Sequence, residues 1–134
     1  MLNKKYKFVL LSILLIMHPL KSIATQWFEA FNKQNIDMLL ELYHHNAQHY
    51  SPKLKIHHPE TNGLIIGKEA LRKWWTDAFQ RLPHLHYHVI KLTADEDQVF
   101  MEYIRQTPGE PDLNVGEVLQ IQNGKIIASR VYHS

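Results

Sequence analysis

Glu117 is an acidic residue on the apolar face of a predicted strand over residues 113–122. In the stretch LNVGEVLQIQ, apolar side chains alternate with polar or small ones, and Glu117 falls in the apolar register. Because alternate residues of a strand point to one face, its carboxyl group is expected to be buried, which raises its pKa. A carboxyl group protonated near neutral pH can act as a general acid. A structural ion pair with Arg105 or Arg130 is the alternative.

A second predicted strand, over 98–107, would bring two further groups beside Glu117. The stretch QVFMEYIRQT places Met101, Tyr103 and Arg105 on one face, which we expect to point inward. There Tyr103 and Arg105 could assist the carboxyl group. The opposite face carries two apolar side chains, Phe100 and Ile104. Apolar residues on an outer sheet face favour contact between two copies of the chain.

A stripe of histidines raises the question of a metal site. It comprises His84, His86 and His88. On a predicted strand over 84–93 this spacing directs the imidazoles to one face, where histidines can bind a metal ion. The complementary face carries Leu85, Tyr87 and Val89. Since these are better suited to contact helices, we expect the histidines on the outer face with Ile90 and Leu92, and no bound metal.

Further histidines lie just before and within a segment that is expected to be a loop, over 52–62. His49 and Ser51 share one face of a short predicted strand over 47–51. His57 and His58 lie within the loop itself, where they either cover a pocket opening or are solvated. His49 is a candidate to assist Glu117 in acid/base chemistry.

The C-terminal strand and the third helix supply the remaining candidates for a pocket wall. Ser129 and His133 are expected to share a face of a strand over 125–133 with Ile127 and Val131. His133 either points into a cavity mouth or is an exposed residue at the chain end. Trp74 and Trp75 cannot point the same way on a helix, so one is expected to be core and the other to line the cavity.

Three helices are expected to cover this sheet. The first contains Trp27, Phe28 and Phe31 at helical spacing, and Asn35 can cap a second helix that ends near His44 and His45. LIIG over 64–67 is a short strand candidate. A broad apolar stripe predicts the third helix over 67–82, and Pro83 ends it.

Beyond Pro83 the apolar period changes from helical to two. Four strands are predicted, over 84–93, 98–107, 113–122 and 125–133, and Asn123-Gly124 is a strong hairpin signal. The order is helix, helix, strand, short strand, helix and a four-strand antiparallel meander. Such an order predicts an α+β domain whose helices cover one face of a curved sheet.

Residues 1–24 are expected to be a secretory signal peptide, which leaves one domain over 25–134. Basic residues precede a ten-residue, mostly apolar run over 8–17 that is too short to span a bilayer comfortably. Ser22 and Ala24 suit cleavage after Ala24. The protein is then exported to the periplasm or secreted, without a membrane partner after cleavage. An uncleaved anchor is the alternative.

Cleavage would also change the charge balance of the chain. It removes four of the 15 basic residues and leaves 11 against 13 acidic ones, a formal charge of −2. No nucleic-acid partner is expected from that balance. The chain has no cysteine, so it forms neither a disulfide nor a thiolate site. Hydrolase, metalloprotease, phosphate-loop and dinucleotide motifs are absent, and no cofactor is expected.

Three stretches resemble the nuclear transport factor 2-like superfamily, especially its SnoaL-like and ketosteroid isomerase-like bacterial members. They are WFEAFNKQNIDMLLELYHHNAQHYSP, GLIIGKEALRKWW and GEVLQIQNGKIIASRVYH. The resemblance covers roughly residues 25–133. It implies a cone-shaped fold, in which a strongly bent, mostly antiparallel sheet wraps around helices and encloses an apolar pocket. It also implies a homodimer that packs through the outer sheet face.

Ketosteroid isomerase itself uses an Asp base, with a Tyr and a protonated Asp as oxyanion donors. The resemblance puts the base at Ser51 and the Tyr donor at Trp27, so only the protonated acid has a counterpart, Glu117. Steroid isomerisation by that mechanism is therefore not expected. SnoaL-like cyclases use a pocket carboxylate, often near a histidine, which Glu117 with His49 or His133 could resemble.

Three functions remain open on this basis. The first is binding of an apolar or aromatic small molecule in the cone. The second is an acid/base enzyme (an isomerase, a polyketide-cyclase-like enzyme or a hydratase) centred on Glu117, with Tyr103 and His49. The third is a dimeric protein-interaction domain whose cone is packed shut. The expected ligand-binding residues are Trp27, Phe31, Ser51, Trp74, Tyr87, Met101, Arg105, Leu119, Ser129 and His133.

Overall fold

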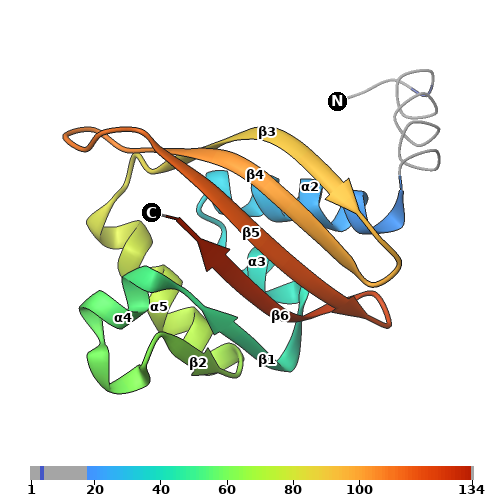
Figure 1. The fold of residues 1–134 in the computed structure, drawn as a ribbon, viewed down its shortest axis with the longest axis horizontal. Coiled ribbons are helices and arrows are strands. Elements are labelled where there is room, and N and C mark those ends of the chain that lie inside the picture. Colours follow the sequence, from blue (N-terminus) through green and yellow to red (C-terminus); the bar gives the residue numbers. More distant parts are fainter. Residues whose placement is uncertain (1–3, 5–17, 134) are drawn as a thin grey trace.

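A six-stranded curved sheet forms the framework of the molecule (Figure 1). The computed structural model describes Lys4 and residues 18–133 of the 134-residue chain. The strand order is β2-β1-β6-β5-β4-β3. Strands β1 and β6 are parallel, and every other neighbouring pair is antiparallel. The predicted α+β fold with a mostly antiparallel sheet is confirmed.

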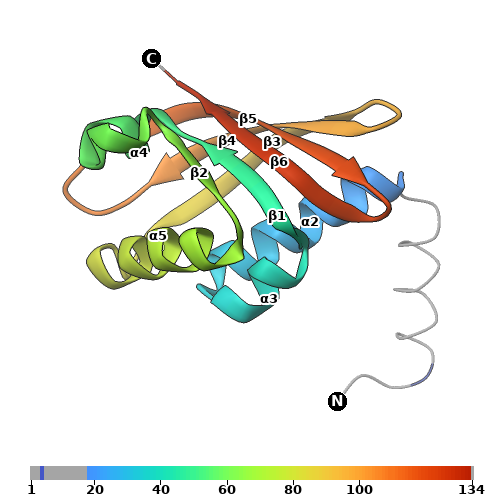
Figure 2. The same ribbon diagram turned by 90° about the horizontal axis from the view of Figure 1, so that it is seen from below.

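Helices cover the concave face of this sheet. The helices are α2 (Pro19–Asn32), α3 (Ile36–Glu41), α4 (Pro52–His57) and α5 (Lys68–Arg81), with the 3₁₀ helix η1 (Pro59–Thr61). The strands are β1 (Tyr43–Tyr50), β2 (Leu64–Ile66), β3 (His86–Ala94), β4 (Gln98–Gln106), β5 (Leu113–Gln122) and β6 (Lys125–Tyr132). Figure 2 shows α2, α3 and α5 on one side of the sheet and α4 near one end of it.

The core lies between these helices and the sheet. Trp27 and Phe31 of α2 stack with ring centroids 5.0 Å apart, and both are buried. Met101 of β4 and Leu119 of β5 are fully buried in the same hydrophobic cluster. Because successive residues of a strand alternate between faces, each of these strands contributes every second side chain to the core.

The predicted secondary structure is wrong in two places, at residues 44–45 and over 52–62. His44 and His45 lie on β1, not at a helix end, because the chain leaves α3 to pair with β6. The Ile126 amide donates to the Leu42 carbonyl, and Tyr43 is aligned with Ile126. The segment over 52–62, expected to be a loop, forms α4 and η1 instead.

Bulges shift two faces relative to the expected alternation. The register of β3 slips between Val89 and Lys91, so Leu92 turns inward opposite Met101 and does not follow the histidine stripe. In β6 the register slips at Ile127, which was expected to point inward with Ser129 and Val131. Ile126 is the residue that points inward there, and it is fully buried. A bulge adds one residue to a strand, which inverts the facing of all residues beyond it.

The expected signal peptide lies largely outside the described residues. Positions 19–24 of that segment form the first part of α2, where Leu20 and Ala24 are buried against the core. No helix in the described part of the chain is long and apolar enough to cross a membrane. Export and the homodimer through the outer sheet face stay predictions from the sequence.

Candidate functional site

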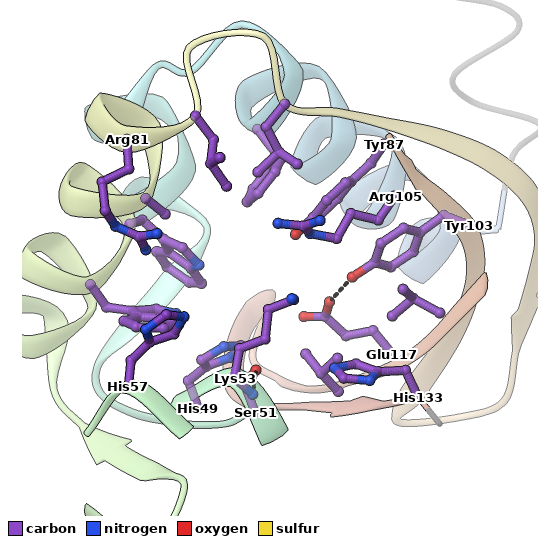
Figure 3. A pocket seen from close by; sticks show the side chains of 18 of the residues that line it. His49, Ser51, Lys53, His57, Arg81, Tyr87, Tyr103, Arg105, Glu117 and His133 are labelled. Atoms are coloured by element: carbon purple, nitrogen blue, oxygen red, sulfur yellow. Dashed lines mark hydrogen bonds between the residues drawn. The ribbon is translucent and has the colours of Figure 1, made fainter. Parts of the chain in front are cut away.

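A cavity of about 170 Å³ lies between the concave face of the sheet, α2, α4 and α5. Figure 3 shows side chains converging on it from all of these elements. An apolar cavity of about 150 Å³ holds a benzene molecule, so this one suits a single substituted ring. Its walls combine aromatic side chains with a small number of ionisable groups.

Glu117 lies on the cavity wall and is almost entirely buried. Its side chain is paired through one oxygen alone: Tyr103 Oη donates to Glu117 Oε1 over 2.8 Å (Figure 3). The second oxygen, Oε2, is buried and has no hydrogen-bond partner among the described residues. Such an orphaned oxygen is costly in a folded protein, and it is the kind of exception that marks a functional group.

The environment of Glu117 tunes its acidity. Burial raises its pKa to about 7, and the hydrogen bond from Tyr103 opposes that rise. The cause is desolvation, which disfavours the charged carboxylate. Near neutral pH the group is therefore present in both forms, which is the condition for efficient acid/base catalysis.

A chain of buried hydrogen bonds joins four residues behind the cavity. Trp27 Nε1 donates to Tyr43 Oη over 3.0 Å, and Tyr43 Oη donates to Ser129 Oγ over 3.2 Å. His49 Nδ1 lies 2.6 Å from Ser129 Oγ. An indole N–H can only donate, so the Tyr43 hydroxyl accepts from Trp27 and is free to donate its own hydrogen to Ser129. The Ser129 hydroxyl can then donate to His49 Nδ1, and with that bond neutral His49 carries its proton on Nε2.

Neutral His49 can offer a hydrogen-bond donor to a ligand. Burial lowers the pKa of His49 to about 3, so the ring is uncharged at neutral pH. His49 lines the cavity, and its Nε2 has no hydrogen-bond partner in the described residues. A neutral imidazole held in one tautomer by its second nitrogen is a defined donor for a carbonyl or oxyanion.

Replacing Ser129 with alanine tests this hydrogen-bond chain. The change leaves Tyr43 Oη and His49 Nδ1 buried without their partner, at a cost of about 1–3 kcal/mol for each group. We expect a loss of that size in urea unfolding at pH 7. In a Tyr43→Phe background the same change should cost less, because one of the two groups is already absent. Equal costs in both backgrounds would contradict the chain.

The cavity mouth is lined by cations. Arg105 is 7% exposed, and its Nη1 pairs with Glu110 Oε2 at 3.0 Å. Lys53 of α4 and Arg81 at the end of α5 line the same opening. The guanidinium of Arg105 holds the pKa of the Glu110 carboxyl below its usual range. This end of the cavity is consequently polar, whereas the interior is aromatic.

The structure brings most of the predicted site residues to this one cavity. Those that line it are Glu117, Tyr103, His49, Trp27, Phe31, Ser51, Trp74, Tyr87, Arg105 and His133. Three others do not line it: Met101, Leu119 and Ser129. The first two belong to the packed hydrophobic core beyond Glu117, and Ser129 acts on the site only through His49.

Sequence reasoning missed several residues of this wall, above all Lys53. The start of α4 carried a signal that could have placed it: Ser51 caps the helix through its hydroxyl, which accepts from the Lys53 amide, and Pro52 occupies the first turn. Both residue types are typical of these positions. Arg81 and Glu110 were also missed, because nothing local indicates that they meet. Trp75, one of the two tryptophans expected to divide between core and cavity, belongs to both.

The histidine stripe does not form part of the cavity. His84 lies in the turn before β3, and the side chains of His86 and His88 are exposed on the outer face. Among the described residues, no group of three or more His, Asp and Glu side chains is arranged to hold a metal ion. His57 lines the cavity, whereas His58 lies beside Trp74 with ring centroids 5.9 Å apart.

Comparison with solved structures finds the same architecture in bacterial proteins. A SnoaL-like protein of unknown function from Burkholderia thailandensis aligns with a TM-score of 0.79 and 22% identity, over 87% of this chain and 94% of that one. A nuclear transport factor 2-like protein of unknown function from Cytophaga hutchinsonii aligns with a TM-score of 0.67 and 17% identity, over 85% and 88%. A protein with a ketosteroid isomerase-like fold from Catenulispora acidiphila aligns with a TM-score of 0.67 and 19% identity, over 84% of this chain and 85% of that one.

The family assignment rests on the sequence as well as the fold. No curated protein matches the chain. The family model of the SnoaL-like domain matches residues 24–129. This range begins within α2 and ends within β6, and it contains all the other helices and strands of the fold. The chain therefore belongs to the SnoaL-like domain family, and it shares its fold with nuclear transport factor 2-like proteins.

Proposed function

We propose that this protein binds a compact aromatic molecule in the cavity and transfers a proton on it, with Glu117 as the acid/base group. The observation that carries the proposal is the free oxygen of Glu117, which is buried at the wall of a cavity large enough for a ligand. A carboxyl group kept only for stability would have both oxygens paired. Proton transfer by a carboxyl group requires no cofactor.

The neighbouring groups divide the work of such a reaction. Tyr103 holds Oε1 of Glu117, which leaves Oε2 to exchange the proton with a ligand. His49 offers its Nε2 hydrogen to an oxygen that becomes negative as the proton leaves carbon. Returning the proton to another carbon gives an isomerisation. A ring closes when the carbanion attacks a carbonyl carbon of the same molecule and the carbonyl oxygen takes the proton. An elimination results when the electron pair of the broken C–H bond expels a leaving group.

The size of the cavity restricts the ligand. About 170 Å³ suits one substituted ring and not the four fused rings of a steroid. Ser51, which the family resemblance aligns with the base of ketosteroid isomerase, has a hydroxyl group that does not titrate in the working range. Both points support a small aromatic ligand and a reaction centred on Glu117 alone.

A neutral chromogenic probe, 5-nitrobenzisoxazole, tests proton abstraction without knowledge of the natural ligand. Removal of its single C3 proton by a carboxylate sends the C–H electron pair into a nitrile and breaks the N–O bond, which yields a coloured cyanophenolate. We expect kcat/KM to rise with pH as Glu117 ionises, with a midpoint near 7. A rate no higher than that of free acetate at the same concentration, or one without this midpoint, would contradict the proposal.

Binding without chemistry is the second candidate, and the aromatic wall favours it. Trp27, Phe31 and Tyr87 form a continuous stack, with ring centroids 4.1 Å apart for Phe31 and Tyr87. The probe would then quench tryptophan fluorescence on binding but give no product. The third candidate, an interaction domain, was expected to have a filled interior, and the cavity argues against it.

A further inference from the structure

Three cationic side chains reach the cavity from three different elements. Lys53 comes from α4, Arg81 from the C-terminal end of α5 and Arg105 from β4. Figure 3 shows Lys53 and Arg105 pointing into the open space, with Arg81 at its edge beside α5. Cations that gather at the mouth of an apolar pocket create a positive potential where a ligand enters.

Two of these three charges already have a partner. Arg105 Nη1 pairs with Glu110 Oε2 at 3.0 Å, and Arg81 Nε pairs with Asp77 Oδ2 at 2.8 Å. Lys53 Nζ forms neither an ion pair nor a side-chain hydrogen bond with any residue in the described part of the chain. Among the described residues, Lys53 is therefore the one of these three cations that has no ion-pair partner.

The position of Lys53 is unfavourable for a cation in the empty site. Its side chain is half-buried, and burial together with the positive charge of Arg105 lowers its pKa, against the opposing effect of Glu110. Arg105 uses one of its five N–H donors for Glu110, which leaves others to face the cavity. An anion between Lys53 and Arg105 would relieve the repulsion and satisfy both groups.

The rest of the wall has the opposite character. Phe31, Trp75 and Leu85 line the interior, and all three are buried. A ligand that fits both regions has an aromatic body and one negative charge at its outer end. A carboxylate matches the single unmatched cation, whereas a phosphate dianion would need a second one.

We propose that the ligand is an aromatic carboxylic acid of about one ring, with its carboxylate bound by Lys53 and Arg105 and its ring directed toward Glu117. The inference rests on the proposed function, since it specifies the substrate class of the same cavity. It assigns Lys53 the role of selecting an acid over a neutral compound of equal shape.

A matched pair of probes tests this inference: trans-cinnamate and trans-cinnamamide, which differ in charge and hardly in shape. We expect the wild-type chain to bind cinnamate about tenfold or more tightly than cinnamamide, measured by titration calorimetry at low salt. Lys53→Met should remove most of that preference, because it weakens the binding of cinnamate far more than the binding of cinnamamide. Lys55→Met, two residues along the same helix on its exposed side, is the matched control and should retain the preference.

A second variant shifts the affinity upward, which misfolding cannot imitate. Glu110→Gln removes the carboxylate that competes for Arg105, so cinnamate should bind about two- to fivefold more tightly and cinnamamide equally well. The inference is overturned if the two probes bind wild type equally, if neither binds, or if Lys53→Met weakens both to the same extent.

The outcome separates this inference from the proposed function. Turnover of the neutral probe without any preference for cinnamate defeats the inference alone. A preference for cinnamate that depends on Lys53, together with ring opening that does not depend on Glu117, defeats the proton-transfer function alone.

Discussion

Replacing Glu117 with glutamine is expected to lower kcat/KM for ring opening of 5-nitrobenzisoxazole about 100-fold or more. Glutamine has nearly the same shape and keeps an oxygen that accepts from Tyr103, but it cannot take up a proton at neutral pH. The loss should therefore fall on the chemical step. The affinity for trans-cinnamamide, which is neutral, should remain close to that of the wild type.

Two controls distinguish a chemical role from a structural one. Glu102→Gln makes the same substitution on the same sheet, on the outer face of β4, and should leave the rate unchanged. The stability of Glu117→Gln is the second control. If the variant were inactive because it unfolds, it would be less stable than the wild type at every pH.

The raised pKa of Glu117 predicts how the difference in stability between the wild type and Glu117→Gln changes with pH. Below its unfolded value of 4.5, both states are protonated and the group contributes nothing. As pH rises toward about 7, the unfolded state ionises while the folded state stays protonated, so the wild type loses about 3 kcal/mol. Glutamine does not titrate, so the variant should gain stability relative to the wild type from pH 4 to pH 8. A constant difference would contradict the burial argument.

Replacing His49 with asparagine should remove a large part of the acid sensitivity of the fold. The folded pKa of about 3 lies below the unfolded value of 6.5, so burial of neutral His49 stabilises the fold fully above pH 6.5. That contribution is lost as pH falls from 6.5 to 3, because the unfolded state gains a proton that the folded state excludes. The loss amounts to about 5 kcal/mol.

The comparison uses the difference between wild type and variant, measured by urea unfolding from pH 7 to pH 4. Asparagine keeps an acceptor for Ser129 near the position of Nδ1, and it does not titrate. His86→Asn, on the exposed outer face, is the matched control and should run parallel to the wild type. A His49→Asn curve that also runs parallel to the wild type would show that His49 is not held neutral by burial.

These two residues give the cavity opposite effects on stability. Near neutral pH the burial of Glu117 is unfavourable, because its carboxyl group is ionised in the unfolded state, whereas the burial of His49 carries no ionisation penalty until the pH falls below about 6.5. A group that destabilises the fold at its working pH is retained when its altered acidity serves a function. This contrast supports the proposed roles of Glu117 in proton transfer and of His49 in hydrogen bonding.

Much of the inner face of the sheet could be predicted from the sequence, because strand alternation is a local property. Glu117, Tyr103 and Arg105 were placed on one side by a period of two, and all three line the cavity. The apolar stripes likewise predicted the third helix and the four C-terminal strands. The cone-shaped fold was predicted from the family resemblance, which rests on those same patterns.

Tertiary structure alone decided how these pieces meet. The parallel contact of β1 with β6 brings His49 to Ser129, 80 residues apart, and a bulge in β3 turns Leu92 inward. Lys53 and Arg105 come from a short helix and a distant strand, and no spacing in the sequence connects them. The pattern of residues along the chain determines which way a side chain points within its own element, because that depends on local backbone geometry. Which side chains share a cavity, which of their charges stay unmatched, and how far their pKa values move depend on long-range packing, and that is settled only when the sheet closes over the helices.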